Sequence, residues 1–497
     1  MAHAFLPRLN GRLTGWLAGT ALALALATPA LAETLEGALA KAYANNPTLT
    51  AARAGQRAND ENVPIQRSAG LPNAGTQGSY TENLVIPGNS FTAPDRQVST
   101  SGRLTVPIYQ GGAVRSGVAA AKARVAAGQA DLRATEASVF SQVVGAYMDV
   151  IRDQAIVALN RNNVEVLDTN LRASRDRFEI GDLTRTDVAQ SQARLALAQG
   201  QLRGAEARLI ASRETYISLV GEAPVDLAPP PPLPGLPTST EDAVTIALAD
   251  NPDIEAAERQ IAASRSDIGV ARAERLPTVS ATLDGSYTNF LNTLKSGVPG
   301  LAAQQTNTGA QVAVGVTIPL FQGGRPAARV RQAQARSSQA IESYVAVERG
   351  VIAQTRAAFA SWQASREVIA ATQQAVDANA LSLEGVRAEN SVGTRSILDI
   401  LNAEQELLSA QVQLVTAERD AYVAAFTLLA AMGKAEARDL GLDGGTLYDP
   451  DANYQRVRGK VWDWADDPAP KQVAPDTRGV PAASAAAPAI ARPGPGQ

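Results

Sequence analysis

The chain has no cysteine and only one histidine among its 497 residues. That histidine is His3, which lies in a segment that we expect to be removed from the mature protein. The mature chain therefore offers neither a thiol nor an imidazole group. This excludes thiol nucleophiles, histidine-based triads and the usual zinc, haem and iron–sulfur sites. We expect no catalytic residue, no metal and no cofactor, so a degradative enzyme is close to excluded.

Aromatic residues are also scarce, at 4% of the sequence. This is typical of long coiled helices rich in Ala, Gln, Arg and Glu, and unlike a jigsaw-packed globular core. Long apolar runs are confined to the N-terminus, where Arg8 and Arg12 are followed by LTGWLAGTALALALA and then by Ala30-Leu31-Ala32. This order predicts a secretory signal peptide over residues 1–32. No other segment has the apolar length that a membrane-spanning helix needs.

A strong positive charge is absent as well. Removing Arg8 and Arg12 from the 45 basic residues leaves 43 against 49 acidic residues in the mature chain. This mild acidity argues against nucleic acid as a partner. Without cysteine, a lipid-anchored form of the mature protein is excluded. The glycine pairs of the chain lack the Lys-Ser/Thr of a phosphate-binding loop, so ATP hydrolysis must come from a partner.

Two similar motifs, LTVPIYQGG at 104–112 and VTIPLFQGG at 316–324, organise the rest of the chain. Each closes a run in which apolar residues alternate with small or polar ones, the pattern of a half-buried strand. Four strands are predicted, at about 73–81, 97–108, 278–288 and 310–319. We expect Pro107 and Pro319 to end their strands, because proline has no amide proton for the ladder. The pairs Gly111–Gly112 and Gly323–Gly324 permit the turn into a helix.

The helices that follow each motif are unusually long, because no proline interrupts residues 108–223 or 327–449. Helical hairpins are predicted over about 113–220 and 325–433, with tips near 181–186 and 391–396. At the tips, Gly181 and Gly393 precede Thr or Ser residues, as in a glycine C-cap followed by a new helix. The leading arm of the first hairpin is about 100 Å long at about 1.5 Å per residue.

Apolar residues recur in the hairpins at the coiled-coil period. In the first hairpin these are Val188, Leu195, Leu202, Leu209 and Tyr216; in the second they are Ile397, Leu401, Leu408, Val412, Val415, Tyr422, Phe426 and Leu429. We expect Leu202 and Leu209 to be buried between helices. Taken alone, these helices favour a soluble coiled coil.

The chain consists of two unequal copies of one unit. Asn46-Pro47 recurs as Asn251-Pro252, an offset of 251 − 46 = 205 residues, and each pair predicts a helix start. The glycine pairs recur at an offset of 323 − 111 = 212 residues. The predicted organisation is a first repeat at 33–223, a proline-rich linker at 224–238, a second repeat at 239–440 and a C-terminal extension at 441–497, disordered from about 468.

Four strands per chain cannot close a barrel. In lipid, each unpaired edge group costs several kcal/mol, and about eight strands form the smallest practical barrel. The strands therefore argue either for several chains that pool them or against a barrel altogether.

Together with the signal peptide and the two motifs, RFEIGDLTRTDVAQSQARLALAQ from Arg177 and VGTRSILDILNAEQELLSAQ from Val392 resemble the TolC family of outer-membrane efflux and secretion channels. The resemblance spans residues 33–441. It implies a mainly α fold with a small membrane β part: a homotrimer in which each chain gives four strands to one twelve-stranded barrel. The helical hairpins continue it as a periplasmic α-barrel, with the linker and tail near its waist.

The resemblance also implies roles for residues at the hairpin tips. Asp399 and Asn402 match an acidic ring at the inner mouth, where the family's stronger pattern has Asp at both positions. A carboxylate ring favours cations, although Asp399 is equally well placed to stabilise a helix start. Arg395, Thr186 and Asp187 match an entrance latch, and the tips at Gly181 and Gly393 match the adaptor-docking ends.

The tyrosine often found five residues before the latch arginine is replaced by Asn390. A solvated surface is the alternative interpretation of Arg395, because an isolated exposed ion pair contributes only about 0–1 kcal/mol.

The implied function is a passive exit duct in the outer membrane, extending into the periplasm. Its implied partners are a periplasmic adaptor and an inner-membrane ABC or proton-driven pump. Small-molecule efflux and type I secretion of polypeptides are not separated by the sequence. A secreted periplasmic coiled-coil scaffold without channel activity is the alternative, and it predicts a protein that conducts nothing.

Overall fold

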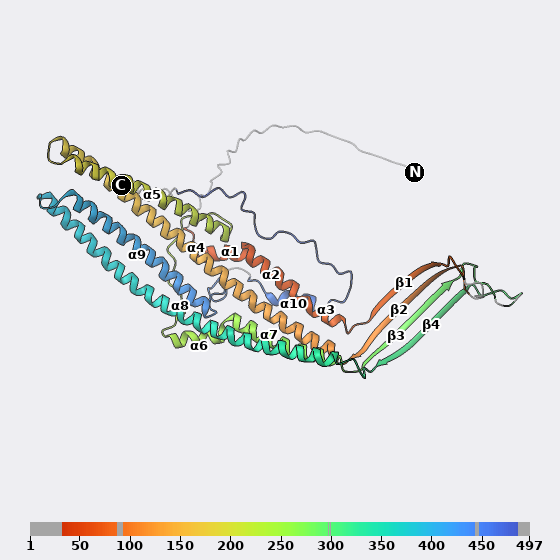
Figure 1. Cartoon of the computed structure of the whole chain (residues 1–497). Coiled ribbons are helices and arrows are strands. Elements are labelled where there is room, and N and C mark those ends of the chain that lie inside the picture. Colours follow the sequence, from red (N-terminus) through yellow and green to blue (C-terminus); the bar gives the residue numbers. More distant parts are fainter. Residues whose placement is uncertain (1–31, 87–92, 297, 299, 443–446, 486–497) are drawn as a thin grey trace, which may run out of the picture.

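The computed structural model describes residues 32–86, 93–296, 298, 300–442 and 447–485, so nearly all of the predicted signal peptide lies outside it. The described chain is elongated, with long helices side by side over most of its length and a four-stranded sheet at one end (Figure 1). The predicted fold class, mainly α with a small β part, is confirmed. None of the helices in the described ranges combines the length and apolar composition needed to cross a membrane.

Two helical hairpins form the long wall. The first consists of α4, Ala113–Glu179, and α5, Arg185–Val220; the second consists of α8, Arg325–Ser391, and α9, Ile397–Ala431. The leading helices α4 and α8 have 67 residues each. They do not pair directly along their length. Instead α9 packs against both of them, and so does α7, which closes the gap nearer the sheet.

Shorter helices repeat the same arrangement in both halves. They are α1, Leu35–Asn45, α2, Pro47–Asp60, and α3, Asn62–Ser68, in the first half, and α6, Thr240–Asp250, and α7, Pro252–Ala273, in the second. Asn46 caps α2 by accepting the Thr48 amide at 2.9 Å, and its Nδ2 donates to Leu219 O at 2.9 Å. Asn251 caps α7 and donates to Ala431 O in the same way. One asparagine thus caps a helix and anchors the end of a hairpin in each repeat.

The sheet is antiparallel throughout, in the order β1-β2-β3-β4. Its strands are β1, Asn73–Glu82, β2, Arg96–Gln110, β3, Thr278–Asn289, and β4, Thr306–Thr317. β4 begins four residues before its expected start at 310, because the register Asn289↔Thr306 extends its pairing with β3. β1 and β4 form the two open edges.

Loops at the end of the sheet away from the helices, residues 83–95 and 290–305, join the strands in pairs. The second loop is the longer one. Its Thr293 folds over the end of β2, where the hydroxyl accepts from Arg96 N at 2.9 Å and donates to Arg96 O at 2.8 Å.

The expectation that Pro107 ends its strand is wrong. β2 continues past it to Gln110, with a register shift between Pro107 and Tyr109. A β-bulge of this kind absorbs a residue that cannot donate to the ladder. Pro319, in contrast, lies two residues beyond the end of β4 at Thr317.

The glycine pairs make the turns into the long helices. Gly111 and Gly112 have φ angles of 61° and 84°, and Gly323 and Gly324 have 60° and 79°. These left-handed conformations disfavour a side chain. Gln322 supports the second turn by donating to Glu274 O at 3.1 Å.

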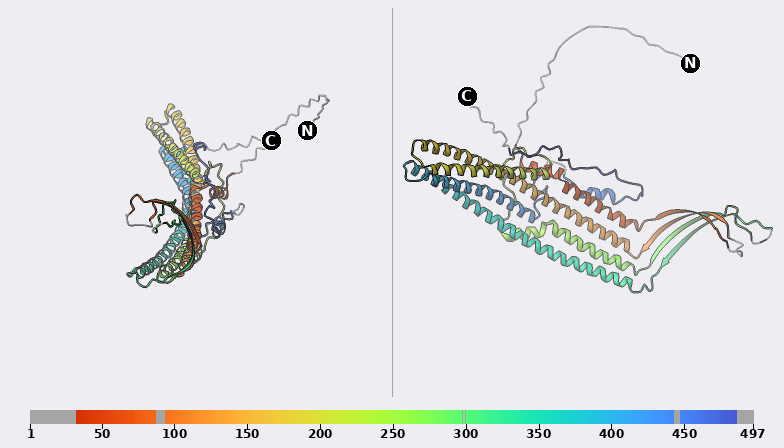
Figure 2. Two further views of the ribbon diagram at one scale, coloured as in Figure 1. Left: turned by 90° about the vertical axis from the view of Figure 1, so that its right-hand side faces the viewer. Right: turned by 45° about the horizontal axis from the view of Figure 1, so that its top comes forward.

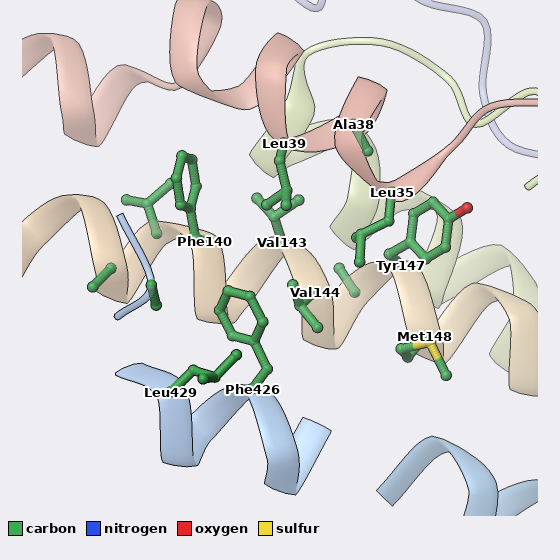
Figure 3. Close-up of a cluster of buried hydrophobic side chains, with 14 of the residues drawn as sticks. Leu35, Ala38, Leu39, Phe140, Val143, Val144, Tyr147, Met148, Phe426 and Leu429 are labelled. Carbon is green, nitrogen blue, oxygen red and sulfur yellow. The ribbon is translucent and has the colours of Figure 1, made fainter. Parts of the chain in front are cut away.

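The main hydrophobic core lies at the waist, midway along the wall. Figure 3 shows Phe140, Val143 and Tyr147 of α4 packed between Leu39 of α1 and Phe426 of α9. The Tyr147 hydroxyl, a single donor, lies 2.8 Å from Glu33 O and 2.6 Å from Ala228 O, so its proton is within reach of both carbonyls. The waist therefore holds the start of the predicted mature chain against the proline-rich linker.

The apolar heptads bury most of their members between helices, including Leu195, Leu209, Tyr216, Leu401 and Phe426. Leu202 is only half-buried, so that part of the prediction is wrong. It packs at the margin of the waist core, not inside it.

The C-terminal extension was expected to be disordered from about 468, and residues 486–497 of that tail lie outside the described residues. The extension first forms α10, Pro450–Val457, which packs on α2. Residues 468–485 then contain no helix or strand, but they run back along α5 (Figures 1 and 2). There, Ala483 N donates to Glu214 Oε1 at 2.7 Å, and Arg213 donates to Ser484 O.

Candidate functional site

The sheet has two faces of opposite character. Residues paired in an antiparallel sheet point to the same side, so the register Leu104↔Leu283↔Val312 places three apolar side chains on one face. The neighbouring row Arg103↔Asp284↔Gln311 lies on the other face, where Arg103 and Asp284 form an ion pair.

The two faces keep this difference along the strands. The apolar face carries Tyr80, Val98, Val106, Val279, Ala281, Tyr287, Val314 and Val316; the polar face carries Gln77, Ser79, Ser99, Ser101, Thr105, Ser280, Thr282, Ser286 and Thr317. Val312 and Val314 remain 76% and 66% exposed. An exposed apolar face of this extent suits contact with lipid, and the polar face suits a water-filled lumen.

Aromatic residues mark both ends of the apolar face. Tyr80 and Tyr287 lie near the loop end of the sheet, whereas Tyr109 and Phe321 lie at the joints, as we call the strand-to-helix connections 107–112 and 319–324. The bulge after Pro107 brings Tyr109 opposite Val279, and so onto the apolar face. Tyrosine is favoured at the two interfaces of a membrane, where its ring and hydroxyl meet different media.

The far end of the molecule is formed by the two hairpin tips, which share one design. Gly181 and Gly393 both have φ of 84°, and the following residues, Asp182 and Thr394, donate their amides to carbonyls five positions back. The returning helices then begin with capping boxes, Thr184 with Asp187 and Ser396 with Asp399. The tips are therefore tight turns that end one helix and start the next without a flexible loop.

Asp399 and Asp187 act as helix caps within the chain. Oδ2 of Asp399 accepts from Ser396 N at 2.9 Å and from Ser396 Oγ at 2.7 Å. These bonds stabilise the ionised form, and they lower the pKa of Asp399 below its usual value. Thr184 lowers the pKa of Asp187 for the same reason. Both side chains therefore carry a fixed negative charge at the tip end of the wall.

Arg395 pairs within its own tip. Its Nε lies 2.7 Å from Glu389 Oε2, and both side chains are about half exposed. Asn390 donates from Nδ2 to Arg395 O at 2.7 Å, so the asparagine supports the turn. Thr186 and Asp187 lie on the other hairpin. Asn402, one turn into α9, accepts from Arg194 Nη2 of α5 at 2.7 Å, which connects the two hairpins.

Behind the tips, the chain joins its two hairpins through a buried carboxylate. Glu404 of α9 is 6% exposed. Its carboxylate accepts from Asn170 Nδ2 of α4 at 3.0 and 3.1 Å, and from Arg387 Nη2 of α8 at 3.0 Å. A small apolar cluster of Leu167, Leu171, Leu195, Ala198 and Leu401 packs beside it. This layer fixes the tips relative to one another within one chain.

Sequence reasoning missed Glu404, Asn170, Arg387, Arg194 and Glu389. A signal existed for Glu404, since it interrupts the apolar seam between Leu401 and Leu408 at heptad spacing. The other four residues belong to solvated helix faces in sequence, and only the packing of the helices shows what they contact.

A helical wall that continues into a sheet with one lipid-facing and one polar face defines a subunit of an outer-membrane channel. The model of the family described as outer membrane efflux protein matches residues 38–222 and 243–434. The chain belongs to this family, and it lies in the outer membrane and extends into the periplasm.

Known relatives agree in kind, and the extent of the match differs between them. The chain is 37% identical over 432 residues to outer membrane efflux protein BepC of Brucella suis, covering 87% of this chain and 92% of BepC. It is 29% identical over 317 residues to alkaline protease secretion protein AprF of Pseudomonas aeruginosa, covering 62% and 64%. The fold resembles the Campylobacter jejuni CmeC outer membrane channel, with a TM-score of 0.70 at 19% identity, covering 91% and 98%.

Proposed function

We propose that three copies of this chain form an exit duct that passively conducts cargo from an inner-membrane pump, through a periplasmic adaptor, to the exterior. The observation that carries the proposal is the amphipathic four-stranded sheet, joined without a break to the helical wall. No step of catalysis is assigned to the chain, and the energy for transport comes from the pump.

The trimer follows from the edges of the sheet. β1 and β4 run antiparallel to each other and lie at opposite edges, so β4 of one copy can pair with β1 of the next. Three copies supply twelve strands, which exceeds the minimum of about eight for a closed barrel. The sheet is already curved in one chain, as the left view of Figure 2 shows.

The inner entrance is proposed at the hairpin tips. Asp399 supplies one carboxylate per copy, held ionised by its cap, and a ring of such charges favours cations over anions. Asn402 is bonded to Arg194 and contributes no charge. The tips at Gly181 and Gly393 are the surfaces proposed to dock on the adaptor, because they are the ends of the wall farthest from the membrane.

The entrance latch is proposed as an exchange of partners. In one chain, Arg395 pairs with Glu389. In the closed ring, Arg395 would leave Glu389 for Thr186 or Asp187 of a neighbouring hairpin. One exposed pair contributes only about 0–1 kcal/mol, but the exchange repeats in every copy.

The experiment is conductance of the full-length protein in planar bilayers without its pump. Arg395→Ser should raise the open conductance or its frequency, because the closed state loses its latch. Glu389→Gln should do the opposite, since it frees Arg395 for the neighbouring hairpin. Arg349→Ser, in the middle of α8, removes the same charge away from the tips and serves as the control.

Unchanged gating in both tip variants would contradict the latch, and a protein that conducts nothing would contradict the duct itself. Asp399→Ala should reduce cation preference without changing the opening frequency. That effect should shrink near 1 M salt, where the screening length is about 3 Å.

The proposal for the cargo rests on two relatives whose names indicate different cargoes. BepC is named for efflux and AprF for secretion of a protease. The higher identity and the fuller coverage favour small-molecule efflux for this chain. Accumulation of a dye in cells that lack the chain would support efflux, whereas loss of a secreted protein without dye accumulation would favour secretion.

A further inference from the structure

A hollow of about 910 Å³ lies where α3 turns into β1. Ile65, Leu71 and Pro72 line one side of it, and Lys460, Val461 and Trp462 line the other. Trp462, Val461 and Ile65 are 73%, 64% and 60% exposed. An open hollow with an apolar part, rimmed by charged residues that include Glu61, Asp463 and Asp466, therefore lies at the level where the helical wall becomes the sheet.

The segment that forms one side of the hollow is held in place. We call residues 460–467 the C-terminal loop. Asp467 closes it by accepting from both Nη atoms of Arg456, at 2.7 and 2.8 Å, and from Lys460 at 3.1 Å. Arg67 of α3 donates to Arg458 O at 2.6 Å, which ties the start of the loop to the wall.

The second repeat has the corresponding corner, between α7 and β3, and there the same chain packs against it. The turn at Gly111 packs so closely that an added Cβ would lie 2.7 Å from Ala273 O and 3.0 Å from Leu276 Cβ. Just before that turn, Gln110 pairs with Thr278 and Tyr109 pairs with Val279. The joint of the first repeat thus covers the corner of the second.

The internal repeat predicts what covers the hollow. The joint of the second repeat lies 212 residues after the joint of the first, and the corner of the first repeat lies 205 residues before the corner of the second. The equivalent pairs are therefore Gln322 opposite Asn73 and Phe321 opposite Ala74. Within one chain, the joint of the second repeat lies at the opposite edge of the sheet from β1. The pairing therefore has to join two copies.

The joint of the second repeat is correspondingly incomplete in one chain. β2 extends to Gln110, but β4 stops at Thr317 and does not reach the equivalent Gln322. Leu320 and Phe321 are 93% and 90% exposed, against 60% and 46% for their equivalents Ile108 and Tyr109. Among the described residues, no atom outside its immediate chain neighbours lies within 4 Å of a Cβ added at Gly323.

The same two offsets, applied to the β2–β3 register, predict how β4 of one copy pairs with β1 of the next, and this pairing keeps the apolar faces of the two copies on the same side. It places Val314 opposite Tyr80 and Val316 opposite Gly78, and all four belong to the apolar face. A shift of one residue would turn the apolar face of one copy toward the lumen. The pairing derived from the repeat is therefore one that closes the barrel with a continuous lipid-facing surface.

We propose that the hollow between the C-terminal loop and the α3–β1 corner seats Leu320 and Phe321 of the next copy, with Trp462 against the Phe321 ring. Aromatic rings in such a seat prefer offset or edge-to-face contacts. The C-terminal extension lies on the convex side of the curved sheet (Figure 2). The extension then clamps neighbouring subunits, an inference that rests on the trimer proposed above.

The test uses the natural lack of cysteine, which makes introduced thiols unambiguous. Full-length protein in detergent carries Phe321→Cys with Trp462→Cys and is treated with a short bifunctional maleimide. We expect covalent dimers and trimers on a denaturing gel. Phe321→Cys with Val473→Cys is the matched control, because Val473 lies in the exposed tail away from the hollow, and it should remain monomeric.

A second pair of introduced cysteines tests trimer formation independently of the clamp. Tyr80→Cys with Val314→Cys tests the strand pairing alone. If this pair forms cross-linked trimers and the 321–462 pair does not, the trimer stands and the clamp is overturned. If neither pair cross-links, the failure lies in the proposed trimer and its register.

A second measurement asks whether Trp462 instead faces lipid or another protein. Trp462→Ala should lower the temperature at which the trimer dissociates by several degrees. Trp464→Ala, two residues away and 82% exposed, does not line the hollow and should leave that temperature unchanged. Equal dissociation temperatures for all three proteins would overturn the clamp.

Discussion

The leading helices α4 and α8 have the same length but very different surroundings. Twenty-four residues of α4 are buried, against eight of α8. α4 is covered by α5, α7 and α9 and also by α1, α2 and α3, whereas α8 packs mainly against α6, α7 and α9 among the elements described. The difference follows from position in the chain, since no later repeat packs against α8.

This contrast shows that the long helix of one repeat is covered in part by helices of the following repeat. α7 of the second repeat lies against α4 of the first, and by the same rule α2 and α3 of the next copy should lie against α8. The exposed side of α8 then corresponds to an interface, and the chain is finished only when a ring closes.

The largest expected effect is therefore in the covered wall. Phe140 of α4 is fully buried, and Phe140→Ala should lower the free energy of unfolding by about 3–5 kcal/mol. Its repeat equivalent is Ile352 of α8, which is half-buried. Ile352→Ala should cost clearly less in chain that has not assembled into trimers, as measured by urea unfolding in detergent. Equal losses at the two positions would break the comparison between the helices.

The next largest effect is expected from glycine substitutions at the two joints. One substitution should impair folding and the other should impair assembly. Gly111→Ala forces a left-handed alanine, which costs about 1–2 kcal/mol, and also a clash with Ala273 O inside the chain. Gly323→Ala has the strain but no clash within one chain. We expect Gly111→Ala to reduce the yield of folded chain, and Gly323→Ala to give folded chain with less trimer on size exclusion. The reverse result would refute the equivalence of the joints.

Glu404 connects the two compared helices, because it accepts from Asn170 of α4 and from Arg387 of α8. Glu404→Ala leaves these donors without their acceptor and should cost about 1–3 kcal/mol. Hydrogen exchange should rise in the tip halves of α4 and α8 and stay unchanged at the waist. Glu404→Gln keeps an acceptor and is the matched control. Faster hydrogen exchange at the waist would contradict the expectation that Glu404 stabilises the tip halves of the helices.

The smallest effect is expected at the tips, where the two repeats are alike. The depressed pKa of Asp399 means that its cap stabilises the folded state above the unfolded value of about 3.9, and that this contribution is lost as the pH falls through the lower folded value. Cation preference should therefore be the same at pH 7 and pH 5 and should decline only below about pH 4. A decline near pH 5 would mean that the cap does not hold in the channel.

The sequence predicted elements that depend on local patterns. Strand alternation, proline-free helices and the glycine tips are set by neighbouring residues, so the fold class was confirmed. Pro107 was misjudged because a bulge depends on the partner strand. Leu202 was misjudged because a heptad does not say where the facing helix ends.

The candidate site was predicted less completely than the fold. Asp399, Asp187 and Arg395 stand next to recognisable tip signals, and the capping role of Asp399 was one of its two interpretations. Asn170 is 234 residues from Glu404 along the chain, and no local pattern connects them. Such contacts depend on how the two hairpins lie together.

The longer loop between β3 and β4 has a consequence for symmetry. Across the sheet, the two repeats are close to equivalent, so a ring of three chains has six similar units in its wall. At the outer rim, only the second repeat carries the long loop, and its Thr293 leans over β2 of the first. The rim is therefore threefold where the wall is nearly sixfold. An extracellular ligand or antibody that recognises this loop should find three sites on each channel and should distinguish one repeat from the other.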